Sequence, residues 1–157
     1  MCKPPHVRRV ANVFLGIDYG SKRIGLSHAD ELGFAFALPA ATALEPAERF
    51  QQIANEISRL RVTQIVLGYP LSVEGERTKR CDEVDAFALE LTRRFQLPIE
   101  KIDEALTSLA ADEMGGRKPR SSKERQEQAR SGERDSRAAA VLLQDYLNSR
   151  GIGTNLL

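Results

Sequence analysis

The order of apolar segments along the chain constrains its fold more than any other feature of the sequence. A short apolar run over residues 13–18 is typical of a strand buried on both faces, and two further strand-like segments follow at residues 23–28 and 34–38. A helix then alternates with strands at residues 64–68 and 98–103, and more helices come last. This order predicts an α/β fold with a mixed central sheet, in which an antiparallel three-strand meander lies beside parallel strands and helices flank both faces.

Apolar residues that recur at helical spacing predict the helices. Pro46 favours the start of the first helix, because a proline at the first helical position loses no hydrogen bond. We expect a second helix over Asp82–Phe95, a short one over Thr107–Met114, and a last one from Asp135 to the glycine at position 151. The polar, basic segment Gly115–Gly132 is expected to be a mobile loop.

Length and composition are those of one soluble globular domain. The chain has 157 residues, of which 41% are hydrophobic and 29% charged. We expect a flexible tail over residues 1–12, a single domain over residues 13–150 and a C-terminal tail over residues 151–157. With neither an apolar signal core nor a run long enough to cross a membrane, the chain is expected in the cytoplasm. Its two cysteines and two histidines lack the spacing of a zinc site.

Three carboxylates fall where predicted elements begin or end. Asp18 ends the first strand, Glu104 ends the last, and Asp135 opens the final helix. Sites in open α/β sheets collect at strand ends, so Asp18 and Glu104 converge if their strands are neighbours. Clustered carboxylates repel unless a cation lies among them, and Mg²⁺ or Mn²⁺ suits oxygen ligands. The alternative is that the acid at a strand end is only a turn residue and the acid at the helix start only a cap. The alternation of side chains along a strand does not decide whether Glu104 or Asp103 faces the site.

Basic residues lie beside the same predicted elements. Two follow the turn after Asp18, three lie at the head of the second helix, where the helix dipole disfavours cations, and three lie in a basic segment. From position 115 to position 134 that segment holds seven basic and three acidic residues. Either they are solvated side chains or they bind the phosphates of a nucleic acid, and the candidates for binding are Lys22, Arg23, Arg77, Lys79, Arg80, Arg117, Lys118 and Arg120.

Four short motifs occur together and in order. They are Gly-Ile-Asp-Tyr-Gly-Ser-Lys-Arg-Ile-Gly at residues 16–25, Val-Leu-Gly-Tyr-Pro-Leu at residues 66–71, Asp103-Glu104 with Leu106-Thr107, and Asp135-Ser136 with Ala138-Ala139. Over about residues 13–147 the chain thereby resembles the YqgF family of bacterial RNase H-like proteins, which are related in fold to Holliday-junction resolvases. The resemblance implies an RNase H-like fold and a metal-dependent nuclease that matures the 5′ end of pre-16S rRNA in ribosome biogenesis.

The resemblance also implies the roles of individual residues. Asp18, Glu104 (rather than Asp103) and Asp135 correspond to the catalytic ligands of Mg²⁺ or Mn²⁺, and the partners would be an rRNA precursor and ribosomal precursor particles. The chain departs from the family at Ala105, where an arginine is usual. That departure favours a non-catalytic nucleic-acid-binding module as an alternative.

A nuclease of this kind could act on DNA instead of RNA. A resolvase of four-way DNA usually works as a two-fold dimer, because its substrate has matching strands to cut. The sequence does not separate RNA from DNA substrates, nor a monomer from a homodimer. An actin-like ATPase would need two such domains, which this length does not hold.

Overall fold

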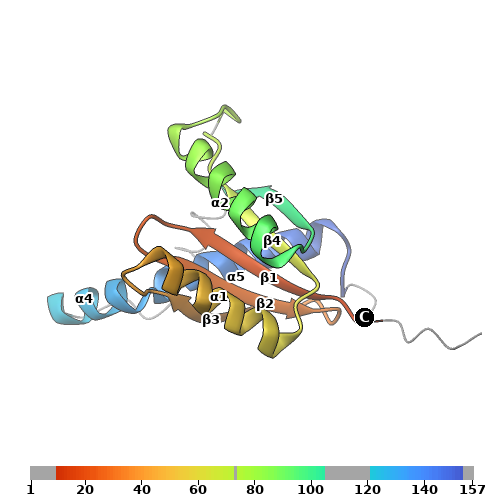
Figure 1. The fold of residues 1–157 in the computed structure, drawn as a ribbon, viewed down its shortest axis with the longest axis horizontal. Helices are drawn as coiled ribbons and strands as arrows, with labels where there is room; N and C mark the ends of the chain where they lie inside the picture. Colours follow the sequence, from red (N-terminus) through yellow and green to blue (C-terminus); the bar gives the residue numbers. More distant parts are fainter. Residues whose placement is uncertain (1–9, 73, 105–120, 154–157) are drawn as a thin grey trace, which may run out of the picture.

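The computed structural model describes residues 10–72, 74–104 and 121–153. Figure 1 shows the elements in chain order, which are β1 (Val13–Tyr19), β2 (Ile24–Asp30), β3 (Phe36–Ala41), α1 (Pro46–Leu60), β4 (Gln64–Tyr69), α2 (Lys79–Phe95), β5 (Ile99–Asp103), α4 (Ser122–Ser131) and α5 (Glu133–Ser149). The strands form one sheet in the order β3-β2-β1-β4-β5, in which β1, β2 and β3 pair antiparallel and β1, β4 and β5 pair parallel. The predicted mixed α/β sheet is confirmed.

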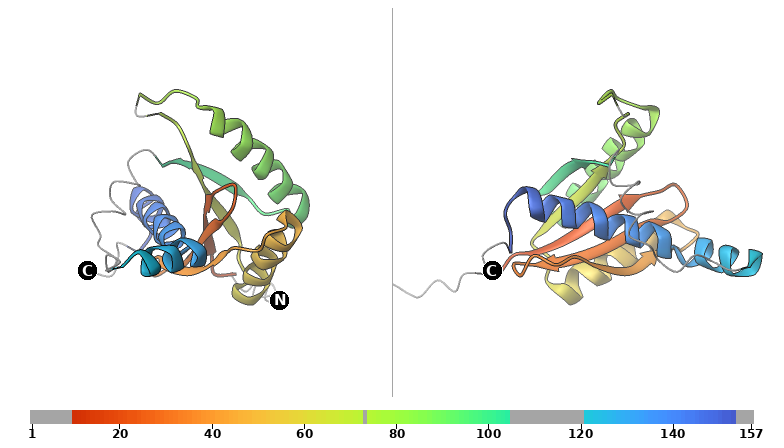
Figure 2. Two further views of the ribbon diagram at one scale, coloured as in Figure 1. Left: turned by 90° about the vertical axis from the view of Figure 1, so that its left-hand side faces the viewer. Right: turned by 180° about the vertical axis from the view of Figure 1, so that it is seen from behind.

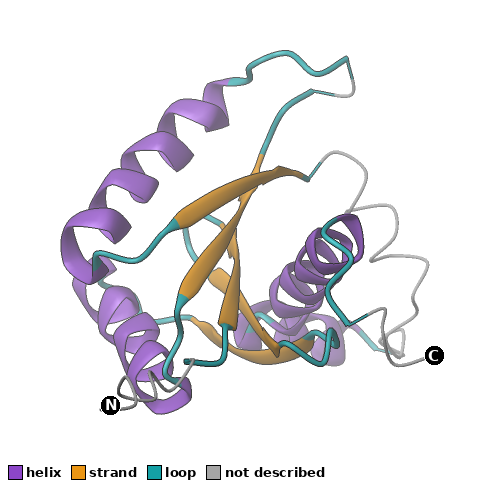
Figure 3. Cartoon of the chain, turned by 90° about the vertical axis from the view of Figure 1, so that its right-hand side faces the viewer, coloured by secondary structure: helices purple, strands orange, loops and turns teal. Residues whose placement is uncertain are grey.

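The sheet separates two layers of helices. In Figures 2 and 3, α1 and α2 lie on one face of the sheet and α5 lies on the other. Alternation along β1 explains this arrangement, since Leu15 belongs to the core cluster that contains Ile53 of α1 and Leu91 of α2. Phe14 points to the opposite face and belongs to the cluster that contains Leu143 of α5. No helix in the described part of the chain is long and apolar enough to cross a membrane.

Small residues on β1 and β2 let α5 lie directly against the backbone of the sheet. A Cβ atom on Gly16 would lie only 3.0 Å from the carbonyl oxygen of Ala139. The hydroxyl of Ser27 donates a hydrogen bond of 2.7 Å to that same carbonyl. The backbone N–H of Leu26 donates to Ser136 Oγ at 3.2 Å. These contacts set the position of α5 over the two strands.

Several predicted boundaries were wrong, each for a local reason. The third strand begins at Phe36, not at residue 34, because the Ala35 N–H donates to Gln144 Oε1 of α5 at 3.0 Å. Helix α2 begins at Lys79 rather than Asp82, because the otherwise unpaired N–H of Thr78 at its start donates to Cys81 Sγ at 3.3 Å. Helix α5 likewise begins at Glu133, after Gly132, whose φ is 69°.

The basic segment expected as a mobile loop was also predicted wrongly in its described part. Residues 122–131 form helix α4, and Ser121 Oγ accepts a hydrogen bond of 3.1 Å from the Glu124 N–H at its start. The remainder of that expected loop and the short helix predicted over Thr107–Met114 lie outside the described residues.

Candidate active site

Asp18 and Glu104 meet across a strand that separates them. Asp18 lies near the end of β1 and Glu104 directly follows β5, but β4 lies between these strands, so they are not neighbours. At the crossing point β4 carries Gly68, where a Cβ would lie 2.8 Å from Glu104 Oε2. Because Gly68 has no side chain, Glu104 extends over β4 and its carboxyl group forms a side-chain hydrogen bond with Asp18.

The packing of α5 also decides between the two adjacent acids after β5. Ile102 pairs with Gly68 and packs into the core cluster under α5. Side chains alternate along a strand, so Glu104 lies on the same face as Ile102 while Asp103 lies on the other. On that other face Lys101 Nζ donates to Asp85 of α2 at 2.8 Å. Glu104, not Asp103, is therefore the acid that meets Asp18.

A second glycine brings Asp135 to the same end of the sheet. Gly25 of β2 pairs with Asp18 across the antiparallel ladder. A Cβ on Gly25 would lie 2.0 Å from the carbonyl oxygen of Asp135, so only glycine lets the first turn of α5 rest there. The Asp135 side chain is about one-third exposed, and its Oδ2 accepts a hydrogen bond of 3.2 Å from Arg23 Nε.

The electrostatics of Asp18 reflect this crowding of acids. Burial raises the pKa of Asp18 to about 8, helped by the negative charge of Glu104 and the hydrogen bond with it, and by the charge of Asp135. The positive charge of Arg80 acts in the opposite direction. Two carboxylates held this close are stable as anions only with a compensating cation.

The carboxylate oxygens of the three acids suit a hard divalent cation, although the three side chains do not surround a single position. In the described residues, no group of three or more His, Cys, Asp or Glu side chains lies close enough to hold a metal ion. Asp18 and Glu104 converge, whereas Asp135 lies on the neighbouring helix and is paired with Arg23. Carboxylate oxygens are the ligands that Mg²⁺ and Mn²⁺ prefer, and a bound cation would offset both the burial of the Asp18 charge and its repulsion by Glu104, which together raise the pKa of Asp18.

The predicted basic residues at the head of α2 occupy different positions. Arg80 Nη2 donates to the carbonyl of Tyr19, next to Asp18, at 2.9 Å. Arg77 instead donates to Tyr69 Oη at 2.8 Å and to two carboxylates of α2, so its guanidinium is engaged inside the chain. Lys79, the first residue of the helix, is exposed. Arg117, Lys118 and Arg120 lie outside the described residues.

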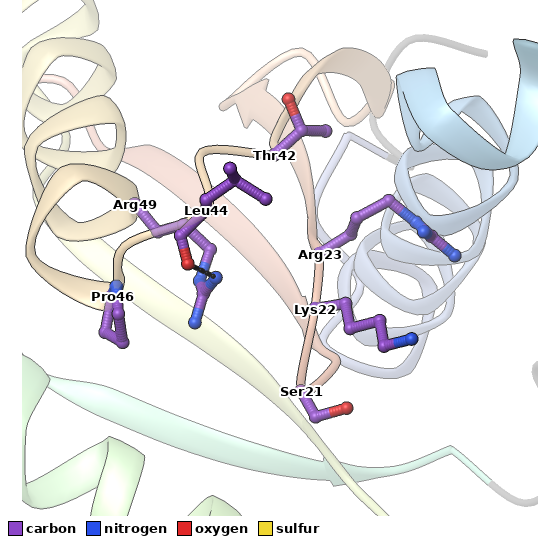
Figure 4. Close-up of a pocket in the computed structure, with 7 residues that line it drawn as sticks. All are labelled: Ser21, Lys22, Arg23, Thr42, Leu44, Pro46 and Arg49. Atoms are coloured by element: carbon purple, nitrogen blue, oxygen red, sulfur yellow. Dashed lines mark hydrogen bonds between the residues drawn. The ribbon is translucent and has the colours of Figure 1, made fainter.

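Lys22 and Arg23 line a cavity of about 580 Å³ beside the acids. Figure 4 shows residues 21–23 along one side of it, and along the other Leu44 of the segment before α1 and Arg49 in the first turn of α1. Sequence reasoning missed Arg49 and did not assign Gly68 to the site. Gly68 lies at the end of an apolar strand, in one of the family motifs, whereas Arg49 carries no sequence signal beyond its place in the first turn of α1.

The mixed sheet carries Asp18 near the end of β1, Glu104 directly after β5 and Asp135 in the first turn of α5, and the class of the protein is that of an α/β nuclease. The family model described as "RuvX: Holliday junction resolvase" matches residues 12–149, so the chain belongs to the RuvX family, also called YqgF. The resemblance noted in the sequence is thereby confirmed.

Individual relatives match over most of their length. A protein of Opitutus terrae named "Putative pre-16S rRNA nuclease" is 39% identical over 137 residues, which cover 87% of this chain and 91% of that protein. A Chloroflexus aurantiacus protein of the same name is 33% identical over 147 residues, which cover 91% of each. Among solved structures, Thermus thermophilus RuvC matches with a TM-score of 0.48 and 18% identity, covering 89% of this chain and 97% of that one.

Proposed function

We propose that this chain is a metal-dependent endonuclease that hydrolyses phosphodiester bonds at the 5′ end of pre-16S rRNA in the cytoplasm. The observation that carries the proposal is the Asp18–Glu104 carboxyl pair over Gly68, with Asp135 one strand away on Gly25. The names of relatives that match nearly the whole chain support the choice of RNA. The partner is then an rRNA precursor, alone or in a ribosomal precursor particle, and the enzyme acts as a monomer or a homodimer.

In this proposal each acid has a distinct part. Asp18 and Glu104 would hold Mg²⁺ or Mn²⁺ between them, and Asp135 would complete the ligand set. The bound cation would supply Lewis acidity and a water of lowered pKa for attack on phosphorus. Arg80, anchored on the Tyr19 carbonyl, would attract the phosphate to the acids. Arg23 holds the Asp135 carboxylate in one orientation until the site is loaded.

A second candidate is resolution of four-way DNA junctions. The description of the matching family favours it, and that match covers residues 12–149. A resolvase must cut two strands symmetrically, so this candidate requires a two-fold dimer.

One experiment separates these functions. The purified protein would be incubated with labelled pre-16S rRNA and with a labelled four-way junction, in Mg²⁺, in Mn²⁺ or in EDTA. We expect metal-dependent cutting of the RNA that Asp18→Asn abolishes. Asp103→Asn, which removes the adjacent carboxylate on the opposite face of β5, is the matched control and should retain activity. Symmetrical cutting of the junction alone would favour the resolvase. Tight binding without cleavage by the wild type or Asp18→Asn would identify a binding module.

A further inference from the structure

The cavity beside the acids has the size and chemistry of a nucleotide site. We propose that it holds an unpaired nucleotide that flanks the scissile phosphate, with Lys22 and Arg49 as the cations that bind the phosphates on either side of that nucleotide. This inference rests on the proposed nuclease function and specifies which form of substrate the site accepts. The cavity volume of about 580 Å³ falls within the range of roughly 300–1,000 Å³ typical of small-ligand sites.

Two positive charges in the cavity have no acidic partner among the described residues. Across residues 10–72, 74–104 and 121–153, no carboxylate forms a salt bridge with Lys22 or Arg49. Arg49 Nη1 donates to the carbonyls of Ala43 and Leu44 at 2.9 and 3.1 Å, which fixes the half-buried guanidinium at the cavity wall. Guanidinium and ammonium groups both bind phosphates, and in Figure 4 Arg49 and Lys22 come from opposite sides of the cavity.

Arg23 connects this cavity to the acids. It lines the cavity and also donates to Asp135, so the cavity adjoins the candidate active site. Successive phosphates of a nucleic-acid strand are close neighbours along its backbone. A strand whose scissile phosphate lies at Asp18 and Glu104 would therefore bring an adjacent nucleotide to Lys22 and Arg49.

The remaining lining suits a sugar and a base rather than an inorganic anion. Leu44 is 91% exposed at the cavity, and Pro46 lies beside it (Figure 4). The hydroxyls of Ser21 and Thr42 provide polar groups for a ribose. An apolar surface beside cations binds the face of a base, and an unpaired base reaches such a surface without the cost of unpairing that a duplex base must meet. The cavity thus favours a single-stranded flank over a duplex.

Binding measurements test this inference separately from cleavage. The affinity of the whole protein for a labelled ten-nucleotide single-stranded RNA and for its duplex would be measured in EDTA over a range of salt concentrations. We expect Lys22→Gln and Arg49→Gln each to weaken single-strand binding by about 5–10-fold at 0.1 M salt and to lower the salt slope by about 0.7. Duplex binding should change less than about twofold, because a paired base does not enter the cavity.

Matched variants separate a binding role from a structural one. Arg61→Gln, at the opposite end of α1, should bind single-stranded RNA like the wild type. Arg49→Lys should recover the salt slope because it keeps the positive charge, although lysine cannot reproduce both hydrogen bonds to the loop carbonyls. Unchanged single-strand affinity in both glutamine variants, or an equal loss on the duplex, would overturn the inference, as would a wild-type protein that does not bind the strand. Absence of cleavage by a wild-type protein that binds RNA would instead reject the proposed function.

Discussion

Arg23 Nε lies 3.2 Å from Asp135 Oδ2, so a cation from the segment before β2 pairs with the acid in the first turn of α5. Both side chains are about one-third exposed, which weakens the effect of the pair on stability through solvent screening. The pair places a positive charge where the proposed function requires a metal ligand. Arg23 therefore competes with a metal cation for Asp135.

This competition predicts an unusual effect of removing a positive charge near a candidate nuclease site. Arg23→Gln should raise the affinity of the protein for Mn²⁺ by about 3–10-fold, because a unit charge near a ligand costs a cation on the order of 1 kcal/mol. Isothermal titration calorimetry measures this affinity. Arg23→Lys keeps the charge and is the control that should show no gain. Equal affinities in all three proteins would indicate that Asp135 does not bind the metal.

The pKa of Asp18 predicts how stability depends on pH without metal. Its folded-state pKa of about 8 lies above its ordinary value of 3.8, so between these pH values the folded protein holds a proton that the unfolded chain releases. Stability should therefore fall as the pH rises from about 4 to about 8. Asp18→Asn should remove this fall and stabilise the metal-free protein by roughly 1–2 kcal/mol at pH 8, with little effect at pH 4.

Urea unfolding in EDTA at both pH values measures this effect. Asp103→Asn is the control and should keep the wild-type dependence on pH. At pH 8, Mg²⁺ should stabilise the wild type more than Asp18→Asn, because a ligand that binds only the folded state stabilises it. Parallel pH profiles for wild type and Asp18→Asn would contradict the account of a crowded acid pair.

Gly68 should tolerate no side chain. In Gly68→Ala the new Cβ would lie 2.6 Å from Leu142 Cδ1 and 2.8 Å from Glu104 Oε2, so Glu104 must move away from Asp18. We expect a stability loss of about 1–3 kcal/mol from overpacking and a loss of cleavage well beyond it. Gly75→Ala has no neighbouring atom within 4 Å and a φ of 80°, so its cost should be confined to the backbone, with cleavage retained. Thermal unfolding and cleavage assays compare the two.

Arg77 and Arg80 should separate stability from catalysis. Arg80→Gln should lower cleavage about tenfold, since it removes a charge worth on the order of 1 kcal/mol near Asp18, and should change the melting temperature little. Arg77→Gln breaks hydrogen bonds to Tyr69 and Asp85 and should lower the melting temperature while RNA affinity stays within about twofold. The opposite result would assign Arg77, not Arg80, to the substrate.

The ends of α1 and α2 contain strain that glycine would relieve. Arg61 and Gln96 terminate these helices in the left-handed conformation, with φ of 55° and 53°. Arg61→Gly or Gln96→Gly should stabilise the protein by about 0.5–1 kcal/mol, because glycine adopts this conformation without a Cβ clash. Arg59→Gly, inside the last turn of α1, should destabilise it by about 1 kcal/mol instead. Denaturant midpoints measure both effects.

The sheet was predictable because its strands have clear apolar patterns, but the helix starts were not. Burial on both faces makes β1 and β4 continuous apolar runs. The first residues of α2 and α5, Lys79 and Glu133, are exposed and so carry no apolar period. Their helical state depends on the hydrogen bond to Cys81 Sγ and on the positive φ of Gly132, neither of which a periodicity reveals.

The choice between Asp103 and Glu104 shows the same limit at the candidate site. Ile99 and Ile102 are three residues apart, so the apolar positions of β5 fit either face of a strand. Only the packing of Ile102 under α5 identifies the face on which Glu104 lies. The crossing over Gly68 likewise depends on strand order, which places β4 between β1 and β5. The family resemblance indicated Glu104, the acid that meets Asp18, whereas residue spacing within β5 did not distinguish it from Asp103.

Helix α5 follows every strand in chain order and carries Asp135 at its start. During synthesis, Asp18 and Glu104 are therefore added to the chain before Asp135. Until α5 docks on the exposed apolar face of the sheet, the nascent chain lacks the core cluster that α5 completes. It also lacks the full set of three acids. In the proposed enzyme of ribosome assembly, this timing would keep the chain inactive toward rRNA while it is still being translated.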